Sequence, residues 1–383
     1  MAIYLDYNAS TPIDPQVLAY MIEVYSNAIG NADSRTHSFG ENARKVTEVG
    51  RKSVAKLLNV NADEVFFTSG ATESNNIAIQ GLREYAEKTG KKHMITTAIE
   101  HHAVLNTMKH MEKEGYKVDY ILPESDGRIN PDEVLNKVRE DTLLVSIMHV
   151  NNETGMIQPI EKIGEELSKR QVLFHVDATQ SCGKLVTELQ KVKYDMLSMS
   201  AHKFHGPQGI GTLVLKKKKY RLPPVKQLFY GGQQEHGIRP GTTPVALVAG
   251  MGKACEIALV KYKENSIKMH AMKDSILDLL KNSGVEYIVH GAQEYCIPST
   301  VNVQFVGVSS EALMIATKQF CGISNGSACT SKSYEPSYVL KAMGLSDQEA
   351  EESVRISWGT DTSEQELKVN LRELLNVVKS IQG

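Results

Sequence analysis

Short apolar runs alternate with longer amphipathic stretches between about residue 60 and residue 215. The longer stretches carry apolar side chains at helical spacing, as in Gln158–Arg170, and predict helices. The short runs predict buried strands over Glu64–Thr68, His93–Thr97, Leu143–Val150, Val172–Asp177, Met196–Ser200 and Thr212–Leu215. Because strands and helices alternate at this spacing, the pattern predicts an α/β fold with a mostly parallel central sheet flanked by helices.

A second pattern begins near Val245. The stretch Val245–Leu280 predicts a long helix, Ser299–Phe305 predicts a strand, and Glu364–Ile381 predicts a C-terminal helix. A chain of 383 residues is also longer than a single hydrophobic core usually supports. We therefore expect a large domain over residues 16–255 and a smaller α/β domain formed by residues 1–15 together with residues 256–383.

The composition is that of an ordinary globular protein, with 41% hydrophobic and 23% charged residues. A net charge of -2 argues against a protein that binds nucleic acid or membranes mainly by electrostatics, and we interpret the basic run Lys216–Lys219 as a solvated loop. The N-terminus lacks a basic region followed by an apolar stretch, and no apolar run approaches the roughly 20 residues of a membrane span. We expect a cytoplasmic protein.

Polar residues follow four of the predicted strands at the point where each strand ends. They are His101, Asn152, Asp177 and Lys203. Each of them alone could be a cap or a turn residue. Because ligands in open α/β sheets bind beyond the carboxyl ends of the strands, four such residues predict a site at this edge of the sheet.

A phosphate-binding segment is expected at Ser69–Asn76, directly after the strand EVFFT. Free backbone N–H groups at a helix start, together with Thr and Ser hydroxyls, suit a phosphate monoester. A plain capping box would explain the same segment in isolation. The segment is not a P-loop, because no Gly-Lys-Ser/Thr follows.

Asp177 and Lys203 are the most informative pair. An Asp at a strand end can keep a pyridine nitrogen protonated, and a Lys one βα unit later can form a Schiff base through its uncharged amine. A buried salt bridge would use the same two residue types. With the phosphate segment upstream and His101 able to stack on a ring, we interpret the pair as a site for pyridoxal 5'-phosphate (PLP).

The five cysteines form no CxxC pair and are odd in number, so we expect reduced thiols rather than a disulfide framework. Cys329 lies in the small, polar stretch 324–333, which predicts a mobile loop able to bring a thiol to a cofactor. Cys255 and Cys321 follow apolar patterns typical of a core, where a thiol is inert. We favour a structural role for Cys182 and interpret Cys296 as a strand-edge residue.

Nine segments, in this order along the chain, resemble the NifS/IscS-type cysteine desulfurases, which are fold-type-I PLP enzymes of the class-V aminotransferase family. The resemblance runs from Tyr4 to about Trp358. The segments are LDYNASTP, TSGATESNN, EHHAVL, MHVNNETG, HVDATQS, SAHKFHGPQGIG, RPGTTPV, NGSACTS and EPSYVLKAMGL.

The resemblance implies a role for each matching residue. Lys203 corresponds to the Schiff-base lysine, Asp177 to the partner of the pyridine nitrogen, and Cys329 to the sulfur-accepting cysteine. His101 corresponds to the residue that stacks on the ring and transfers protons. The remaining correspondences are Gln180 for the phenolic oxygen, Ala71, Thr72, Ser200 and His202 for the phosphate, Thr242 for the partner subunit's phosphate in a homodimer, and Asn152 and Arg355 for the substrate carboxylate.

The implied reaction converts L-cysteine to L-alanine and leaves the sulfur as a persulfide on Cys329, with His101 as the candidate proton acceptor. An acceptor protein would then take the sulfur for iron–sulfur clusters, tRNA thiolation or DNA phosphorothioation. The sequence departs from the housekeeping relatives because it stops at Gly383 without their longer tail and carries Thr360 where several have a basic residue. The acceptor therefore stays open, and we hypothesise a dedicated pathway rather than general supply.

Two other functions would suit the same fold. A selenocysteine lyase uses this scaffold, and a non-catalytic assembly protein could retain it, although Lys203, Asp177 and Cys329 argue against the second. We expect no metal site, because the histidines His101, His102, His202 and His205 lack the spacing of metal ligands.

Overall fold

The computed structural model describes residues 2–326 and 336–383, which form two sheets of three or more strands and a small strand pair. The larger sheet has the order β2-β8-β7-β6-β5-β3-β4. Its strands are β2 (Val65–Thr68), β3 (His93–Thr97), β4 (Lys117–Ile121), β5 (Thr142–Met148), β6 (Leu173–Asp177), β7 (Met196–Ser200) and β8 (Gly211–Leu215). The neighbouring strands β4, β3, β5, β6 and β7 run parallel to one another. Strand β8 runs antiparallel to both of its neighbours, β7 and β2. The expected mostly parallel sheet is confirmed.

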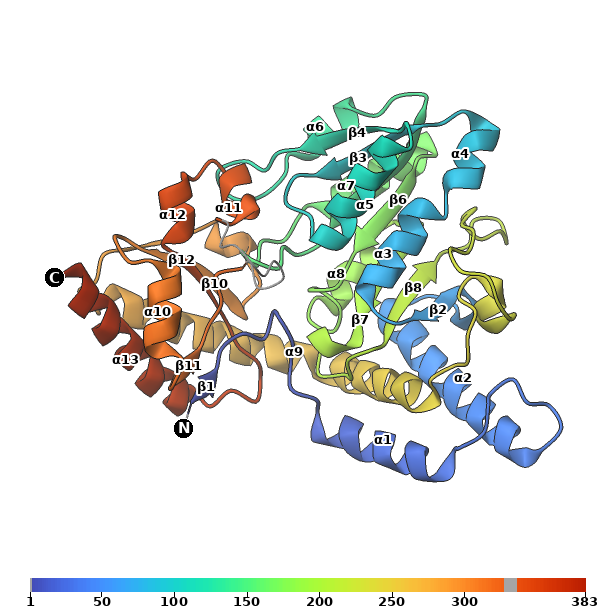
Figure 1. Cartoon of the computed structure of the whole chain (residues 1–383), viewed down its shortest axis with the longest axis horizontal. Helices are drawn as coiled ribbons and strands as arrows, with labels where there is room; N and C mark the ends of the chain where they lie inside the picture. Colours follow the sequence, from blue (N-terminus) through green and yellow to red (C-terminus); the bar gives the residue numbers. More distant parts are fainter. Residues whose placement is uncertain (1, 327–335) are drawn as a thin grey trace.

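Both faces of this sheet are buried, which explains why its strands are continuously apolar. In β5, Val145 packs into a core with Leu167 of one covering helix, whereas the adjacent Leu144 packs on the opposite face with Met108. Figure 1 shows helices on both sides of the sheet. The helices of this region are α3 (Ala71–Gln80), α4 (Arg83–Thr89), α5 (His102–Lys113), α6 (Pro131–Asn136), α7 (Ile160–Arg170) and α8 (Val186–Lys191), with single turns η1 (Ala62–Glu64), η2 (Ala201–Lys203) and η3 (Gln234–Gly237).

A second unit has its own core. Its antiparallel sheet has the order β12-β10-β9, and the N-terminal strand β1 pairs in parallel with β11 beside it. The elements are β1 (Ile3–Tyr4), β9 (Tyr287–Val289), η4 (Gln293–Tyr295), β10 (Thr300–Phe305), α10 (Ser310–Thr317), β11 (Cys321–Gly322), α11 (Tyr338–Ala342), α12 (Asp347–Glu351), β12 (Ser353–Ser357) and α13 (Glu364–Gln382). This core suits the expected small domain, although the boundaries given above stay a prediction.

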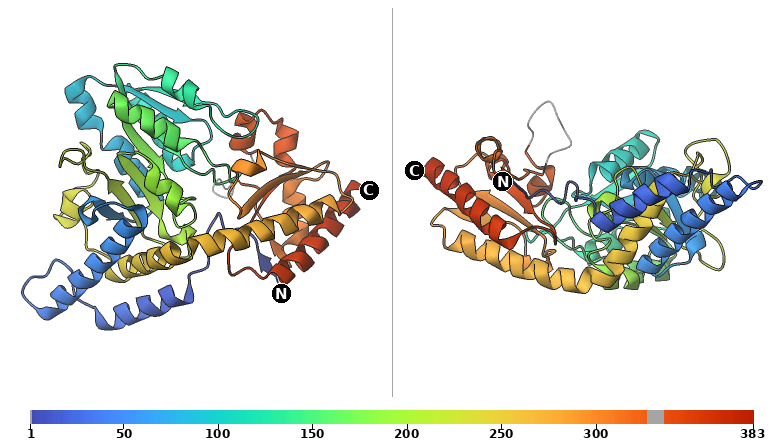
Figure 2. Two further views of the ribbon diagram at one scale, coloured as in Figure 1. Left: turned by 180° about the vertical axis from the view of Figure 1, so that it is seen from behind. Right: turned by 90° about the horizontal axis from the view of Figure 1, so that it is seen from below.

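One helix, α9 (Val245–Lys281), runs along both units. Its first half carries Cys255 into the core of the large sheet and packs on α1 (Pro15–Asn27) and α2 (Ser38–Leu58). Its second half carries Met272 and Ile276 into the core of the small unit. The two cores therefore share one continuous helix, as Figure 2 shows from below. No helix among the described residues is both long and apolar enough to cross a membrane.

Candidate active site

A cavity of about 480 Å³ opens at the carboxyl ends of the parallel strands, between the large sheet and the small unit. Residues at or just after the carboxyl ends of β3, β5, β6 and β7 meet in it. They are His101, Asn152, Asp177 and Lys203. Parallel strands present all their carboxyl ends at one edge, so residues from four separate strands line a single site.

Lys203 reaches the cavity because the turn η2 starts directly after β7. Its Nζ donates hydrogen bonds to the backbone carbonyl oxygens of Asn8, at 2.7 Å, and Ala9, at 2.8 Å. The amide nitrogen of Gln180 donates to the same Asn8 oxygen at 2.8 Å. The N-terminal segment, which is far away in sequence, therefore orients the lysine amine.

Asp177 is the last residue of β6 and is 4% exposed. Its Oδ2 accepts a hydrogen bond from Asn75 Nδ2 at 2.8 Å, and its Oδ1 accepts from the backbone N–H of Thr179 at 3.0 Å and from the Thr179 hydroxyl at 2.5 Å. Three hydrogen-bond donors therefore fix the position of this buried carboxylate. Such a carboxylate can hold a protonated ring nitrogen.

The phosphate candidate lies where β2 passes into α3. Gly70 is the N-cap of α3 and supplies no side-chain hydrogen bond to the first turn, so a complete capping box is absent from this helix start. Ala71, Thr72, Ser200 and His202 line the cavity beside it. The backbone of Gly211 in β8 lies close to Gly70, and a Cβ added to Gly211 would lie only 2.6 Å from the Gly70 Cα. The helix start therefore presents backbone donors to the cavity, as an anion requires.

His101 caps the start of α5, and its Nδ1 accepts the N–H of Ala103 at 3.1 Å. Burial lowers the pKa of His101 below the usual histidine value; the charges of Lys203 and His102 lower it further, while Asp177 opposes them. The imidazole is therefore neutral near pH 7 and able to accept a proton. Burial, assisted by Lys203, lowers the pKa of His202 to about 4.

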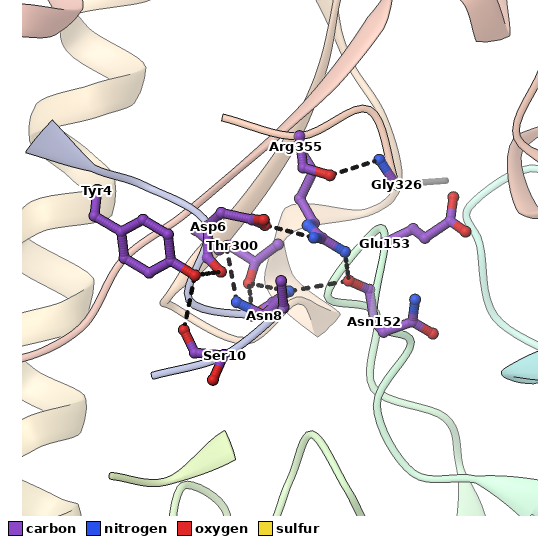
Figure 3. A network of polar contacts seen from close by, with 12 residues as sticks. Tyr4, Asp6, Asn8, Ser10, Asn152, Glu153, Thr300, Gly326 and Arg355 are labelled. Atoms are coloured by element: carbon purple, nitrogen blue, oxygen red, sulfur yellow. Dashed lines mark hydrogen bonds and ion pairs between the residues drawn. The ribbon is translucent and has the colours of Figure 1, made fainter. Parts of the chain in front are cut away.

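Arg355 of β12 brings a guanidinium from the small unit to the cavity (Figure 3). Its Nη2 lies 2.6 Å from Oδ1 of Asp6, and its Nη1 donates to the Asn152 carbonyl oxygen at 2.8 Å. The Asn8 side chain donates to the same Asn152 oxygen at 3.1 Å. Two polar atoms, Asn152 Oδ1 and Arg355 Nε, are buried without a partner among the described residues. The site therefore retains polar atoms that a ligand could engage.

The donors and acceptors of this cavity fit PLP. The volume lies within the roughly 300–1,000 Å³ of small-molecule sites. A lysine amine, a buried carboxylate and a helix start stand around one space, as the aldehyde, ring nitrogen and phosphate of that cofactor require.

The described cavity lining accounts for all but two of the expected site residues. Thr242 is exposed and does not belong to the cavity lining that the described residues form. Cys329 lies outside the described residues. The other cysteines are Cys182, Cys255, Cys296 and Cys321, which are buried, and burial raises the pKa of each thiol.

Sequence reasoning assigned no role to several residues that the structure brings to the site. Asn75 lies in the segment TSGATESNN one helical turn after Ala71, so its contact with Asp177 had a local signal. Asp6 and Asn8 lie in LDYNASTP, but their neighbours Arg355 and Lys203 are far along the chain. Sequence spacing carries no information about such contacts.

Comparison with known proteins identifies the family of this chain. The chain matches the family described as aminotransferase class-V over residues 3–369. It is 43% identical to the cysteine desulfurase IscS of Pasteurella multocida over 385 residues, covering 100% of this chain and 94% of that protein. A NifS-like protein superposes with a TM-score of 0.91 at 36% identity, covering 99% of this chain and 100% of that one. SspA in complex with cysteine superposes with a TM-score of 0.81 at 35% identity, covering 94% and 99%.

Proposed function

The chain belongs to the class-V aminotransferase family and, within it, to the PLP-dependent cysteine desulfurases, and on this premise we propose how its own residues carry out the reaction. The enzyme has the PLP fold type I and takes sulfur from L-cysteine. The expected fold, activity and cofactor are therefore confirmed. The role of each site residue is a proposal.

Residues of the large unit hold the cofactor in the proposal. When bound, PLP supplies an electron sink that stabilises the negative charge left by the departing α-proton of the substrate. Lys203 binds the aldehyde through its uncharged amine, and Asp177 keeps the ring nitrogen protonated. His101 stacks on the ring, and Gln180 donates to the phenolic oxygen. Ala71, Thr72, Ser200 and His202 bind the phosphate.

Arg355 and Asn152 bind the carboxylate of L-cysteine. The guanidinium already lies between Asp6 and the Asn152 carbonyl, so its plane is fixed before substrate arrives. A fixed guanidinium can grip a carboxylate through two parallel hydrogen bonds. This contact orients the substrate so that its sulfur faces the thiol of Cys329.

His101 and Cys329 complete the sulfur transfer. The neutral imidazole accepts the thiol proton, because a thiolate and not a thiol is the nucleophile. The Cys329 thiolate attacks Sγ of the substrate; the new S–S bond forms as the Cβ–Sγ bond breaks, and the three-carbon fragment leaves as alanine after protonation. The raised pKa of the four buried cysteines supports Cys329 as the acceptor.

A homodimer belongs to the same proposal. Thr242 is exposed and is assigned to the phosphate of the partner subunit. Helix α1 and the loop after it expose apolar side chains, with Ile22 57%, Tyr25 63% and Ile29 74% exposed. Exposed apolar groups that gather on one element favour an interface between subunits.

The sulfur acceptor is proposed to be a protein of a dedicated pathway, whether for iron–sulfur clusters, tRNA thiolation or DNA phosphorothioation, and not the standard scaffold protein that serves general iron–sulfur supply. A pull-down with a standard iron–sulfur scaffold protein tests this, and tight binding would contradict it. A cytoplasmic location is proposed with it, because a thiol that carries a persulfide must be kept reduced.

The convergence of Lys203 and Asp177 on one cavity is the observation that carries the mechanism. Lys203→Ala is expected to lose the visible absorbance of the lysine-bound cofactor and to lower alanine release from L-cysteine by at least about a thousandfold. The exposed Lys162→Ala is the matched control and should retain both. A Lys203→Ala protein with the full absorbance band and normal turnover would refute the assignment.

A further inference from the structure

The carboxylate of Glu153 lies against residues on both sides of the stretch that carries Cys329. Its Oε2 accepts a hydrogen bond from the Ser337 hydroxyl at 2.5 Å. On the other side, a Cβ added to Gly326 would lie 2.5 Å from the same Oε2, so the Gly326 backbone packs on the carboxylate. Gly326 has a φ of +87°, which suits glycine. One side chain therefore contacts both the residue before and a residue after 327–335.

The backbone of Glu153 is held by the side chain of Asn151, two residues before it. Oδ1 of Asn151 accepts the N–H groups of Glu153, at 2.9 Å, and Thr154, at 3.0 Å. Asn152, the neighbour of Glu153, lines the cavity and accepts the guanidinium of Arg355. Figure 3 shows Glu153 and Gly326 on the same side of Arg355. The position of Glu153 is therefore coupled to the residues that bind substrate.

Hydrogen bonds hold the residues on each side of 327–335, namely 324–326 before it and 337–340 after it. The backbone N–H of Arg355 donates to the Ser324 carbonyl at 2.5 Å, and the Ser324 hydroxyl accepts the N–H of Gly326 at 3.2 Å. On the other flank, Ser337 is the N-cap of α11, and its hydroxyl oxygen accepts the N–H of Leu340 at 3.2 Å. Glu153 thus connects the start of α11 to the strand that carries Arg355.

Glu153 is only 2% exposed, so its carboxylate is costly to bury. Burial raises the pKa of Glu153, whereas the Ser337 hydrogen bond and the charge of Arg355 lower it. An apolar side chain would avoid the cost of removing a charged group from water. A carboxylate oxygen, however, can accept a hydroxyl on one flank while the backbone of the other flank packs on it.

We propose that Glu153 is a positioning residue that holds together the two flanks of the Cys329 stretch and thereby sets where that thiol meets the sulfur of the bound substrate. This inference rests on the proposed role of Cys329. Glu153 acts through Gly326 and Ser337, while Asn152 beside it and Arg355 fix the substrate. One loop therefore sets both partners of the sulfur transfer.

The test separates substrate binding from sulfur transfer. In Glu153→Ala, the absorbance change on adding L-cysteine to the PLP-loaded enzyme is expected to stay within about twofold in amplitude and apparent affinity, while persulfide formation in a single turnover slows at least about tenfold. Glu153→Gln keeps an acceptor for Ser337 and should restore most of the rate. Glu64→Ala removes a similarly buried carboxylate from the large unit and is the control for lost stability alone.

Amide hydrogen exchange gives a readout that does not depend on turnover. Exchange at residues 324–326 and 337–340 should rise in Glu153→Ala and not in Glu64→Ala. Gly326→Ala, which forces a Cβ into the carboxylate, should reproduce the result if Glu153→Ala does not fold. Unchanged exchange and unchanged persulfide formation, or an equal slowing in Glu64→Ala, would overturn the inference. If the unaltered enzyme formed no persulfide, the role of Cys329 would fail instead, and exchange would still decide whether Glu153 holds the flanks.

Discussion

Burial sets the chemistry of single residues around the cavity as much as residue type does. His101 is kept neutral by burial, whereas Asp177 receives three hydrogen bonds that suit its charged form. Glu100, next to His101, is fully buried; its Oε1 accepts the Thr97 hydroxyl at 2.8 Å and the N–H of Met148 at 2.9 Å, and its Oε2 has no partner among the described residues. Burial raises the pKa of Glu100 to about 8, with hydrogen bonds from Met148 and Thr97 lowering it and Asp177 raising it.

Glu100→Gln is expected to stabilise the enzyme at alkaline pH. Between about pH 4.5 and about pH 8, Glu100 is protonated in the folded state but ionised in the unfolded state. The free energy of unfolding therefore falls as the pH rises through this range. The neutral amide removes this loss while keeping an acceptor for Thr97 and Met148. We expect a gain of about 2–4 kcal/mol in unfolding free energy at pH 8.5 and little change at pH 4.5, measured by denaturant unfolding at both values. Equal effects at the two pH values would show that Glu100 is not protonated in the folded protein.

Cys329→Ala should uncouple substrate binding from desulfuration. The variant is expected to retain the absorbance change on adding L-cysteine, because Lys203 and Arg355 are intact, and to release alanine at least about a hundredfold more slowly. Cys255→Ala, a change in the core of α9, is the control and should retain turnover. A Cys329→Ala enzyme that is fully active on L-cysteine would contradict the persulfide role of Cys329. Full activity of this variant on selenocysteine but not on L-cysteine would show that only the cysteine reaction needs the thiol.

At the scale of elements, the site is a consequence of strand direction and of how each strand ends. Four parallel neighbours, β3, β5, β6 and β7, present their carboxyl ends together, and short connections place His101 and Lys203 within a few residues of those ends. The antiparallel strand β8 closes the phosphate side, because Gly211 allows it to approach Gly70. The arrangement of the cavity therefore depends on strands that are rigid because both their faces are buried.

Helices α2 and α9 pack closely where Gly50 and Gly252 meet, and we expect that no side chain fits at Gly252. A Cβ there would lie 2.5 Å from the Gly50 Cα, so the two helices would have to move apart. Gly252→Ala should destabilise the protein by about 1–3 kcal/mol, although alanine is the better helix former, because overpacking outweighs helix propensity. The neighbouring Lys253→Ala, which is partly exposed, is the control, with about 0.5 kcal/mol or less of change. Denaturant unfolding measures both, and a more stable Gly252→Ala would contradict the crossing.

At the scale of the whole molecule, the cavity needs both units. The large sheet supplies Asp177 and Lys203, the small unit supplies Arg355, and the N-terminal segment supplies the carbonyl groups that orient Lys203. Helix α9 enters both cores, so it resists separation of the two units. In the proposed mechanism, substrate and cofactor bind where three distant parts of the chain meet.

A mixture of two inactive variants should regain activity if Thr242 serves the partner subunit. Lys203→Ala subunits still carry Thr242, and Thr242→Ala subunits still carry Lys203, so a mixed dimer has one complete site. After unfolding and refolding together, turnover is expected to exceed the sum of the two separate proteins at least about twofold. Sedimentation should show a particle of twice the 42.3 kDa chain. A monomer in solution, or a mixture with no gain, would refute the shared site.

The sequence predicted elements wherever burial repeats along a single segment. The strands His93–Thr97 and Met196–Ser200 have the expected bounds, and α7 and α9 lie close to theirs. Strand β4 was missed because Lys117 and Asp119 at this sheet edge are not buried, which removes the apolar signal. The reversed direction of β8, which runs antiparallel to both β7 and β2, was also not predicted, because apolar periodicity is the same for either direction.

The sequence by itself determined the family and the cofactor chemistry, and it predicted the residues of the proposed site, because all of these depend on short segments with a local pattern. The tertiary structure decided which distant groups meet: the carbonyls of Asn8 and Ala9 at Lys203, Asp6 at Arg355, and Glu153 between Gly326 and Ser337. These contacts join residues whose separation along the chain follows no period. They exist because packing two cores along one helix brings the segments together, and burial then gives each polar group a partner or a shifted pKa.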